Sequence, residues 1–197
     1  MHQQRSEETR NRIIETANLL FSKNGYDATG VAEICQAANV SKGAFYHHFP
    51  SKQALFLATM ENWLIGLDNG LSLTVQETAD IPHALIEMAE FVGSIYQSAD
   101  VSLSIFLEFW VQAHRDPVIW QSAISPYRRY QDYFARLIQE GIDQGSLRQV
   151  DPHQAGRVLV SLAVGILMQA LFDSSATDWQ LEARESIRLV LDGLARR

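Results

Sequence analysis

The sequence predicts an all-α protein of about nine helices, in which a small N-terminal module joins a larger helical body. Apolar residues recur at three- and four-residue intervals through most of the chain, and no useful stretch alternates with a period of two. Ser, Asp, Pro and Gly signals separate these stretches, as they do at helix ends. With 197 residues, 47% of them hydrophobic, the chain is long enough for a sizeable core.

Two short helices joined by a tight turn are predicted between residues 31 and 49. Apolar side chains recur at helical spacing along the first helix, which gives it one buried stripe. Thr29 or Gly30 can cap its start. Asn39 tolerates the left-handed backbone that a tight turn needs, and Ser41 can cap the second helix.

The second helix is predicted to run from Lys42 to about Phe49, where Pro50 ends it. Successive residues lie 100° apart around a helix, so Phe45 and Phe49 share one face and Gly43 lies opposite. An outer face with few bulky atoms lets the backbone and the Lys42 ammonium approach base edges in a DNA major groove. The pattern therefore predicts a three-helix DNA-binding domain of the helix-turn-helix type.

A wider set of residues extends this pattern over residues 9 to 56. They are Thr9, Arg10, Ile13, Ala17, Leu20, Phe21, Gly25, Tyr26, Val40, Ser41, Lys42, Gly43, Phe45, Tyr46, His48, Phe49, Lys52 and Leu55. In order and spacing, this run closely resembles the N-terminal domain of TetR-family bacterial regulators. Gly30 departs from the family pattern, which often has a second Thr there, and this change removes a cap or a phosphate contact.

The resemblance implies that double-stranded operator DNA is contacted by the outer face of the second helix and by residues flanking it. Lys52 lies at a helix start, where a cation is unfavourable unless a phosphate is near. Tyr46 also suits a packing role with a hydrated hydroxyl. The implied DNA-binding residues are Arg10, Thr29, Ser41, Lys42, Gly43, Ala44, Tyr46, His47 and Lys52.

The net charge of the chain changes sign near residue 52, close to the end of this pattern. Residues 1–52 carry a net charge of +1 and the remainder −8, which gives −7 for the whole chain. An acidic body is repelled by a DNA duplex, so DNA affinity should be confined to the N-terminal part. We therefore expect a DNA-binding domain at residues 1–52 and an effector-binding and dimerisation domain at residues 53–197.

Capping signals divide the body into further helices. Ser51 opens a helix that continues to about residue 71 and joins the two modules. Pro after Ser or Asp suits a helix start, and Gly suits an end. The remaining helices are expected at about 83–98, 100–114, 117–122, 126–145, 152–172 and 178–195.

The last two helices are predicted to form a dimer interface. Nearly every residue from 158 to 172 is apolar, which predicts that this helix is covered all round. Two such helices from each of two subunits would form a four-helix interface, although they could instead complete the core of a monomer. The predicted interface residues are Val158, Leu159, Leu162, Ile166, Ala170, Ala183, Ile187, Val190, Leu191 and Leu194.

Aromatic residues crowd the middle of the body, and some of them should line an effector pocket between helices. Glu108 and His114 interrupt an apolar helix and are candidate polar groups of that pocket. Alternatively, they face solvent or pair with Arg128 or Arg115. The predicted ligand-binding residues are Trp63, Leu67, Met88, Phe91, Phe106, Glu108, Trp110, His114, Tyr127, Tyr130 and Met168.

A second, weaker resemblance concerns the effector class. Residues 107–117 are similar to the effector domains of regulators of choline and betaine metabolism. Such a resemblance implies a cationic effector held by Glu108 beside Trp110.

Other function classes are disfavoured. The chain has no HExxH motif, serine elbow, phosphate-binding glycine loop or Cys/His metal spacing, so we expect no enzyme, metal or cofactor. Cys35 is the sole cysteine, and its place on a packing stripe favours a small buried residue. No apolar run of membrane-spanning length and no signal peptide was evident, which predicts a cytoplasmic protein.

The expected function is a ligand-responsive transcriptional regulator. We expect a repressor that binds a palindromic operator as a homodimer and is released by a small, largely apolar molecule. The alternatives are a transcriptional activator and a helical ligand-binding protein that does not bind DNA.

Overall fold

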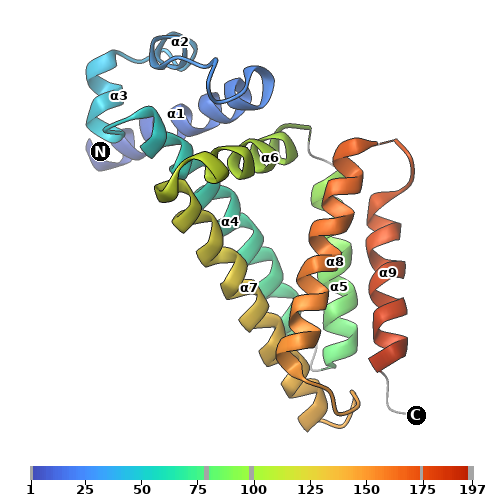
Figure 1. The fold of residues 1–197 in the computed structure, drawn as a ribbon. Coiled ribbons are helices and arrows are strands. Elements are labelled where there is room, and N and C mark those ends of the chain that lie inside the picture. Colours follow the sequence, from blue (N-terminus) through green and yellow to red (C-terminus); the bar gives the residue numbers. More distant parts are fainter. Residues whose placement is uncertain (1, 78–79, 98–99, 174, 195–197) are drawn as a thin grey trace. The chain divides into compact units, whose positions relative to one another are not determined.

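The computed structural model describes residues 2–77, 80–97, 100–173 and 175–194, and these form nine helices and no strand. The all-α prediction is confirmed (Figure 1). The helices are α1 (His2–Asn24), α2 (Val31–Ala37), α3 (Lys42–His48), α4 (Lys52–Glu77), α5 (Ile81–Gln97), α6 (Asp100–Arg115), α7 (Pro117–Asp143), α8 (Pro152–Phe172) and α9 (Trp179–Leu194).

One predicted helix break is wrong. Separate helices were expected at 117–122 and 126–145, but α7 continues through Pro126. Proline in a helix interior removes one backbone donor, and the amphipathic pattern on both sides of Pro126 is strong enough to keep the helix intact. The predicted start of α8 is confirmed, because the Asp151 carboxylate accepts hydrogen bonds from the backbone N–H groups of His153 and Gln154.

The chain forms two compact units. The first contains α1, α2, α3, α6, α4 as far as Ile65 and α7 as far as Ala123. The second contains the rest of α4 and α7 together with α5, α8 and α9. Both α4 and α7 thus contribute to both units. The expected functional boundary at residues 52 and 53 stays a prediction.

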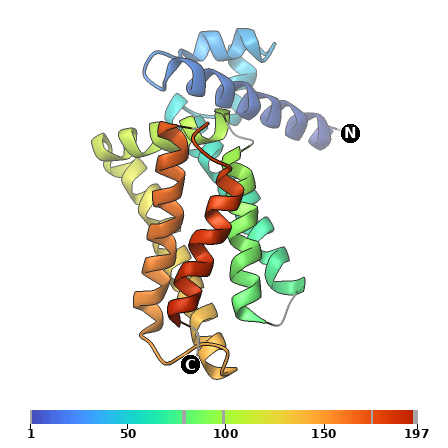
Figure 2. The same cartoon turned by 90° about the vertical axis from the view of Figure 1, so that its right-hand side faces the viewer.

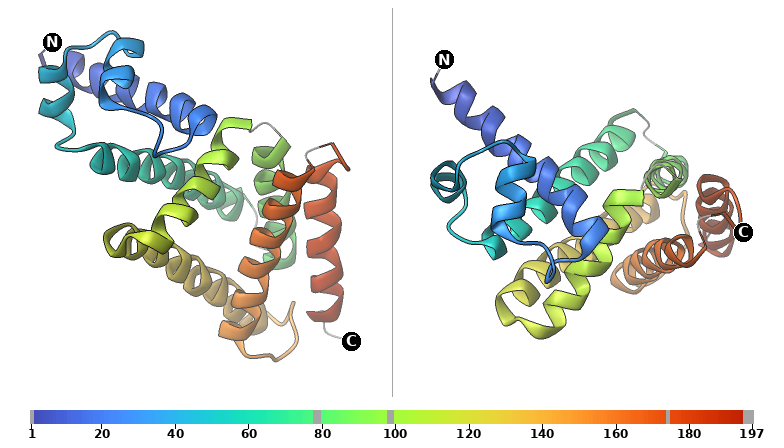
Figure 3. Two further views of the ribbon diagram at one scale, coloured as in Figure 1. Left: turned by 45° about the horizontal axis from the view of Figure 1, so that its top comes forward. Right: turned by 90° about the horizontal axis from the view of Figure 1, so that it is seen from above.

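Aromatic side chains form the core of the first unit. Phe21, Phe45 and Phe56 are almost completely buried, and the rings of Phe21 and Phe56 meet edge to face with centroids 5.4 Å apart. Phe109 of α6 joins this core, with its ring centroid 5.6 Å from that of Phe56. Helix α6 also packs against α1, and Figure 3 shows the two helices next to each other. Cys35 is buried in the same core, as predicted.

The loop between α1 and α2 is held by the side chain of Lys52. Its Nζ donates hydrogen bonds to the carbonyl oxygens of Tyr26 at 2.8 Å and Thr29 at 3.0 Å, and it lies 3.5 Å from that of Asp27. The ammonium also lies 4.2 Å from the centroid of the Tyr26 ring, a cation–π distance. The charge of Lys52 therefore stabilises the loop from inside the protein.

Glu108 of α6 holds the same loop from another direction. Its Oε1 accepts a hydrogen bond from the backbone N–H of Tyr26 at 3.0 Å and another from Nε2 of Gln112, also at 3.0 Å. Gln112 is buried, so this small network is partly shielded from water. A hydrogen bond to a charged acceptor is stronger than a neutral one, particularly away from water. Helix α6 is thereby linked directly to the loop that precedes the helix-turn-helix.

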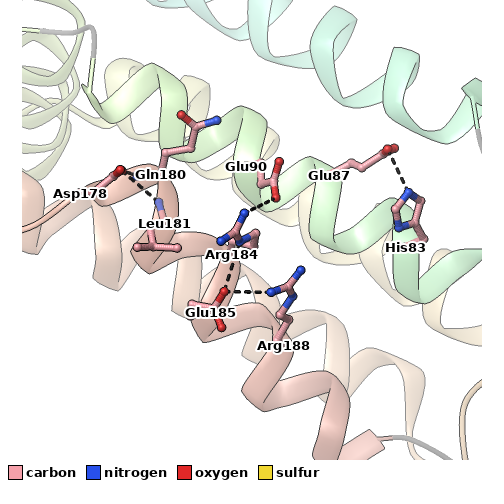
Figure 4. Close-up of polar contacts among 9 residues, drawn as sticks. All are labelled: His83, Glu87, Glu90, Asp178, Gln180, Leu181, Arg184, Glu185 and Arg188. Carbon is pink, nitrogen blue, oxygen red and sulfur yellow. Dashed lines mark hydrogen bonds and ion pairs between the residues drawn. The ribbon is translucent and has the colours of Figure 1, made fainter.

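In the second unit α5, α8 and α9 lie side by side (Figure 2). The contact between α5 and α9 is close at Gly93, where an added Cβ would come within 2.6 Å of the Gln180 Cα. Arg184 of α9 reaches Glu90 of α5 with an N–O distance of 3.5 Å (Figure 4). Glycine at position 93 is therefore what permits this approach.

Helix α8 is long and apolar enough to cross a membrane by length and composition, the one such helix among the described residues. The expectation that no segment reaches this length is therefore wrong. Leu159, Ile166 and Ala170 are buried within the protein, so part of this apolar surface is used in packing against α5 and α9.

We expect Glu108→Ala to speed hydrogen exchange at the Tyr26 amide. Loss of a charged acceptor costs about 1.5–3 kcal/mol, so exchange should accelerate roughly tenfold or more. Hydrogen exchange followed by NMR measures this at a single amide, and Glu108→Gln, which retains an oxygen acceptor, should restore most of the protection. Glu61→Ala, an exposed change on α4, is the control. An unchanged Tyr26 rate in Glu108→Ala would show that the network does not hold the loop.

Candidate nucleic-acid interface

Helix α3 is fixed at both ends by the residues predicted from sequence. Asn39 has a φ of 52°, the left-handed backbone that the turn before α3 requires. The Ser41 side chain accepts a hydrogen bond from the Ala44 backbone N–H at 3.0 Å. Phe49 is extended, and Pro50 follows it. The structure therefore supports both predicted ends of a helix of seven residues.

The two faces of α3 differ as predicted. Phe45 and Phe49 are buried, with the Phe45 side chain 0% exposed. Lys42, Gly43 and His47 are exposed. Tyr46 is 53% exposed and its ring meets that of Phe45 edge to face, with centroids 5.2 Å apart. The buried aromatic side chains anchor the helix, and its solvent-exposed face is polar and has few bulky side chains. Beside this face, Ser41 is exposed and Ala44 is half-buried.

Gly43 has no packing role within the protein. A Cβ added there would meet only the Ser41 Oγ, at 3.7 Å, which is ordinary van der Waals contact. Its backbone is helical, so left-handed geometry does not require glycine either. Glycine in a helix costs about 0.5–1 kcal/mol relative to alanine. The fold of this chain therefore does not itself require glycine at position 43.

Positive charge lies around α3 as well as on it. The Arg10 guanidinium lies 5.4 Å from the centroid of the Phe49 ring, which brings α1 to the C-terminal end of α3. Burial, together with the nearby His47 and Arg10, holds the pKa of His48 below its ordinary value. This favours the neutral form of His48, and Lys42 and Arg10 supply positive charge at this surface.

Two residues expected at the DNA are turned inward and are withdrawn from the set. Thr29 is 0% exposed, and its hydroxyl donates to the Gly25 carbonyl oxygen at 2.8 Å. The Lys52 ammonium is occupied by loop carbonyls, as described above. Both are residue types that contact phosphates, and in both the polar group is used to hold the α1–α2 loop.

The residues predicted to bind an effector are divided between the two units. Trp63, Glu108, Trp110 and His114 belong to the first unit, whereas most of the others belong to the second. Glu108 is bonded to the loop and His114 is exposed, so the pairing of Glu108 with an effector cation is not supported. The side chain of Phe106 lies outside the described ones.

Several predicted ligand residues have structural partners instead. The Trp110 ring meets that of Trp120 edge to face, with centroids 6.3 Å apart. The Tyr130 hydroxyl donates to Oδ1 of Asp68 at 2.7 Å, and burial together with this carboxylate raises its pKa. Phe91 packs on Gly70, leaving no room there for a Cβ. Leu67 packs in the core of the second unit, while Tyr127 and Met168 are half-buried.

A cavity of about 50 Å³ lies in the second unit, between α4, α5, α7, α8 and α9. Met88 is the one predicted ligand residue that lines it. Phe134, one of the aromatic residues that crowd the body, also lines it but is not in the predicted ligand-binding set. Three small residues from three different helices, Ala89, Ala163 and Ala183, line it as well and are not in that set either. Small residues set among larger ones on neighbouring faces are the signal that could have indicated this space.

Most of the predicted dimer residues face the inside of the subunit. Leu159, Ile166, Ala170, Ala183, Ile187 and Leu191 are buried in the single chain, and Leu162 lines the cavity, so we withdraw these seven. Val158 is exposed, and Val190 and Leu194 are half-buried. The large apolar side chains that α8 and α9 expose are Val158, Phe172, Leu181 and Leu189.

Comparison with known proteins places this fold and surface in a family. The family model of bacterial regulatory proteins of the tetR family matches residues 13–59, and that of the C-terminal part of BetI-type transcriptional repressors matches residues 88–196. The HTH-type transcriptional regulator UidR of Escherichia coli is 25% identical over 196 residues, which cover 98% of this chain and 95% of UidR.

Two solved structures show the same fold. A transcriptional regulator from Saccharomonospora viridis in complex with choline has a TM-score of 0.82 and 21% identity, over 97% of this chain and all (100%) of that one. SmeT in complex with triclosan has a TM-score of 0.84 and 21% identity, over 96% of this chain and 92% of SmeT. The chain belongs to the TetR family of DNA-binding transcriptional regulators.

Proposed function

We propose that this regulator binds a palindromic operator as a homodimer, represses transcription in the bacterial cytoplasm and is released by a small, largely apolar molecule. The observation that carries the DNA-binding part is the outer face of α3, where Gly43 has no packing role and lies between exposed Lys42 and Tyr46. A helix with this face can enter a major groove closely enough for its backbone and ammonium to reach base edges.

The contact set follows from exposure and charge. Lys42, Tyr46 and His47 are exposed on α3, and the half-buried Arg10 lies beside its end. Lys and Arg reach phosphates and base edges, while Tyr and His donate to phosphates. We retain these residues with Ser41, Gly43 and Ala44 as the proposed DNA contacts.

Repression rather than activation is proposed because the C-terminal match is to repressors. The chain itself does not encode where the operator lies relative to a promoter, and an operator that lies upstream of the promoter would favour an activator. Choline and triclosan in the two structural relatives are a cation and an aromatic hydrophobe, so relatives leave the effector class open. The members of the family are regulators, so we propose no enzymatic activity.

Operator binding can be separated from folding at Gly43. We expect Gly43→Ala to raise the free energy of unfolding by about 0.5–1 kcal/mol, because alanine favours the helix and has room. The same methyl should weaken operator binding by about 1–3 kcal/mol, because it lies where the backbone meets the DNA. Urea unfolding and a gel shift with the region upstream of the gene measure the two effects. Gly66→Ala, at an open position on α4, is the matched control for stability.

Lys42→Ala tests the charge contribution of the same face. Because a dimer carries two copies of Lys42, operator affinity should fall at least roughly tenfold, and the slope of log affinity against log salt should decrease by about two. The double variant of Lys42 and Tyr46 to alanine should nearly abolish binding while the circular dichroism spectrum stays helical. Unchanged operator affinity in the folded double variant would refute DNA binding through α3.

The dimer is proposed to form through the exposed apolar residues of α8 and α9. Phe172 is 78% exposed and Leu189 is 77% exposed, which are large fractions for apolar side chains unless another surface covers them. Because the two heads of a C2 dimer read half-sites about 34–36 Å apart or a multiple of that, the operator should be palindromic.

We expect Phe172→Asp combined with Leu189→Asp to convert a dimer into a monomer. A charge at the centre of an apolar interface would have to be desolvated without a partner, which disfavours association. Light scattering should change from twice the chain mass to 22.2 kDa. Leu19→Asp, at an exposed apolar position of α1, should leave the dimer intact. A native protein that is already 22.2 kDa at micromolar concentration would exclude this dimer.

A further inference from the structure

The cavity of the second unit exists because three helices present alanine to the same space. Ala89 of α5, Ala163 of α8 and Ala183 of α9 line it. One turn beyond Ala89, an added Cβ at Gly93 would lie 3.1 Å from the Ala183 Cβ, which shows how closely α5 and α9 approach there. Small side chains on closely packed helices leave a void when their large neighbours cannot collapse into it.

All twelve side chains that line the cavity are apolar. They are Leu, Ile, Val, Met, Ala and a single Phe, Phe134. Moving a charged or polar group into such an apolar space without a partner costs several kcal/mol. A quaternary ammonium is held in proteins by several aromatic faces or by a carboxylate, and this lining offers one ring.

The two acidic residues of α5 that adjoin cavity residues in the sequence, Glu87 and Glu90, point elsewhere. Residues of α5 lie 100° apart, so Glu87 is on the side of the helix opposite Leu85 and Ala89, which line the cavity. Its Oε1 lies 3.1 Å from Nε2 of His83, as Figure 4 shows. Glu90 is paired with Arg184 between α5 and α9. Oε2 of Glu87 is buried and has no hydrogen-bond partner among the described residues, but the helix geometry turns it away from the cavity. Neither Glu87 nor Glu90 lines the cavity.

We infer that this cavity binds the uncharged hydrocarbon end of a small molecule and excludes quaternary ammonium ions such as choline. Its volume of about 50 Å³ is about a third of the 150 Å³ of an apolar cavity that holds benzene. It therefore accepts an alkyl terminus of a few carbon atoms. Met88, a flexible and polarizable side chain in the wall, is the residue that can move to admit a longer chain.

The inference rests on the proposed function in one respect only: that the molecule bound in the cavity is the effector that releases the operator. Binding itself is a property of the cavity. Each buried methylene raises affinity roughly fourfold. A series of straight-chain alcohols should therefore bind more tightly with each added carbon, until the cavity is full.

The four methionines provide a direct readout. In protein labelled with ¹³C at the methionine methyl groups, 1-hexanol should shift the Met88 signal saturably. The Met60 signal should not respond, because Met60 is buried in the core of the first unit. Choline at the same concentrations should leave Met88 unchanged. The inference is overturned if choline shifts Met88 saturably, or if no alcohol from 1-butanol to 1-octanol does.

A variant whose cavity is filled by a larger side chain tests the same inference. Ala163→Leu places three more carbon atoms in the space, so 1-hexanol should bind at least roughly tenfold more weakly. Ala37→Leu makes the same change at an exposed position of α2 and should bind 1-hexanol like the original protein. If Ala163→Leu does not fold, Ala89→Leu fills the same cavity from α5. Undiminished 1-hexanol binding in a folded, filled variant would place the ligand elsewhere.

Operator binding by the same protein separates the two proposals. A protein that binds operator DNA in a gel shift but whose Met88 signal ignores the alcohols contradicts the cavity inference alone. A protein whose Met88 signal responds but that binds no operator contradicts the proposed function alone. If 1-hexanol releases the original protein from its operator but does not release Ala163→Leu, the molecule bound in the cavity is the effector.

Discussion

The burial of Phe45 and Phe49 beneath α3 is the constraint on which the DNA-binding surface depends. A helix of seven residues is too short to be stable by itself in water. It persists because its aromatic side is packed in the core and because Ser41 caps its start. Once one face supplies the stability, the other needs no packing residues, and a glycine there costs little compared with what the core contributes. The residues on the exposed face of α3 are therefore not constrained by packing and can suit contact with another molecule.

The loop before this helix pair is stabilised by polar groups that residue type alone would assign to DNA. Lys52 supplies donors to carbonyls that lack helical partners, Thr29 bonds to the Gly25 carbonyl oxygen, and Glu108 accepts the Tyr26 N–H. Buried backbone groups must be paired, and in this short loop side chains pair several of them. A lysine at a helix start is therefore as well explained by nearby carbonyls as by a phosphate. Exposure and hydrogen-bond partners decide between these two explanations.

The sequence predicted most of the first unit and much less of the second. In and directly after α3, Phe45 and Phe49 recur four residues apart among small and polar residues, so the pattern itself shows which side is buried. In α8 almost every residue is apolar, so the pattern cannot show which side faces the core and which faces a partner, and the interface was assigned to Leu159 and Ile166, which are buried. The pocket was missed for a related reason. Aromatic residues are the usual lining of such a pocket, but Tyr130 and Trp110 have partners of their own here, and three alanines are among the residues that line the space.

The apolar character of α8 has an explanation if both of its faces are used. Its inner face, with Leu159, Ala163 and Ile166, lines the cavity, while its outer face exposes Val158 and Phe172. Protein interiors are close-packed, so a molecule larger than the void has to displace the walls that enclose it. One of those walls is the helix proposed to contact the second subunit. A ligand in the cavity and a partner on the outer face would therefore contact the same helix on different sides.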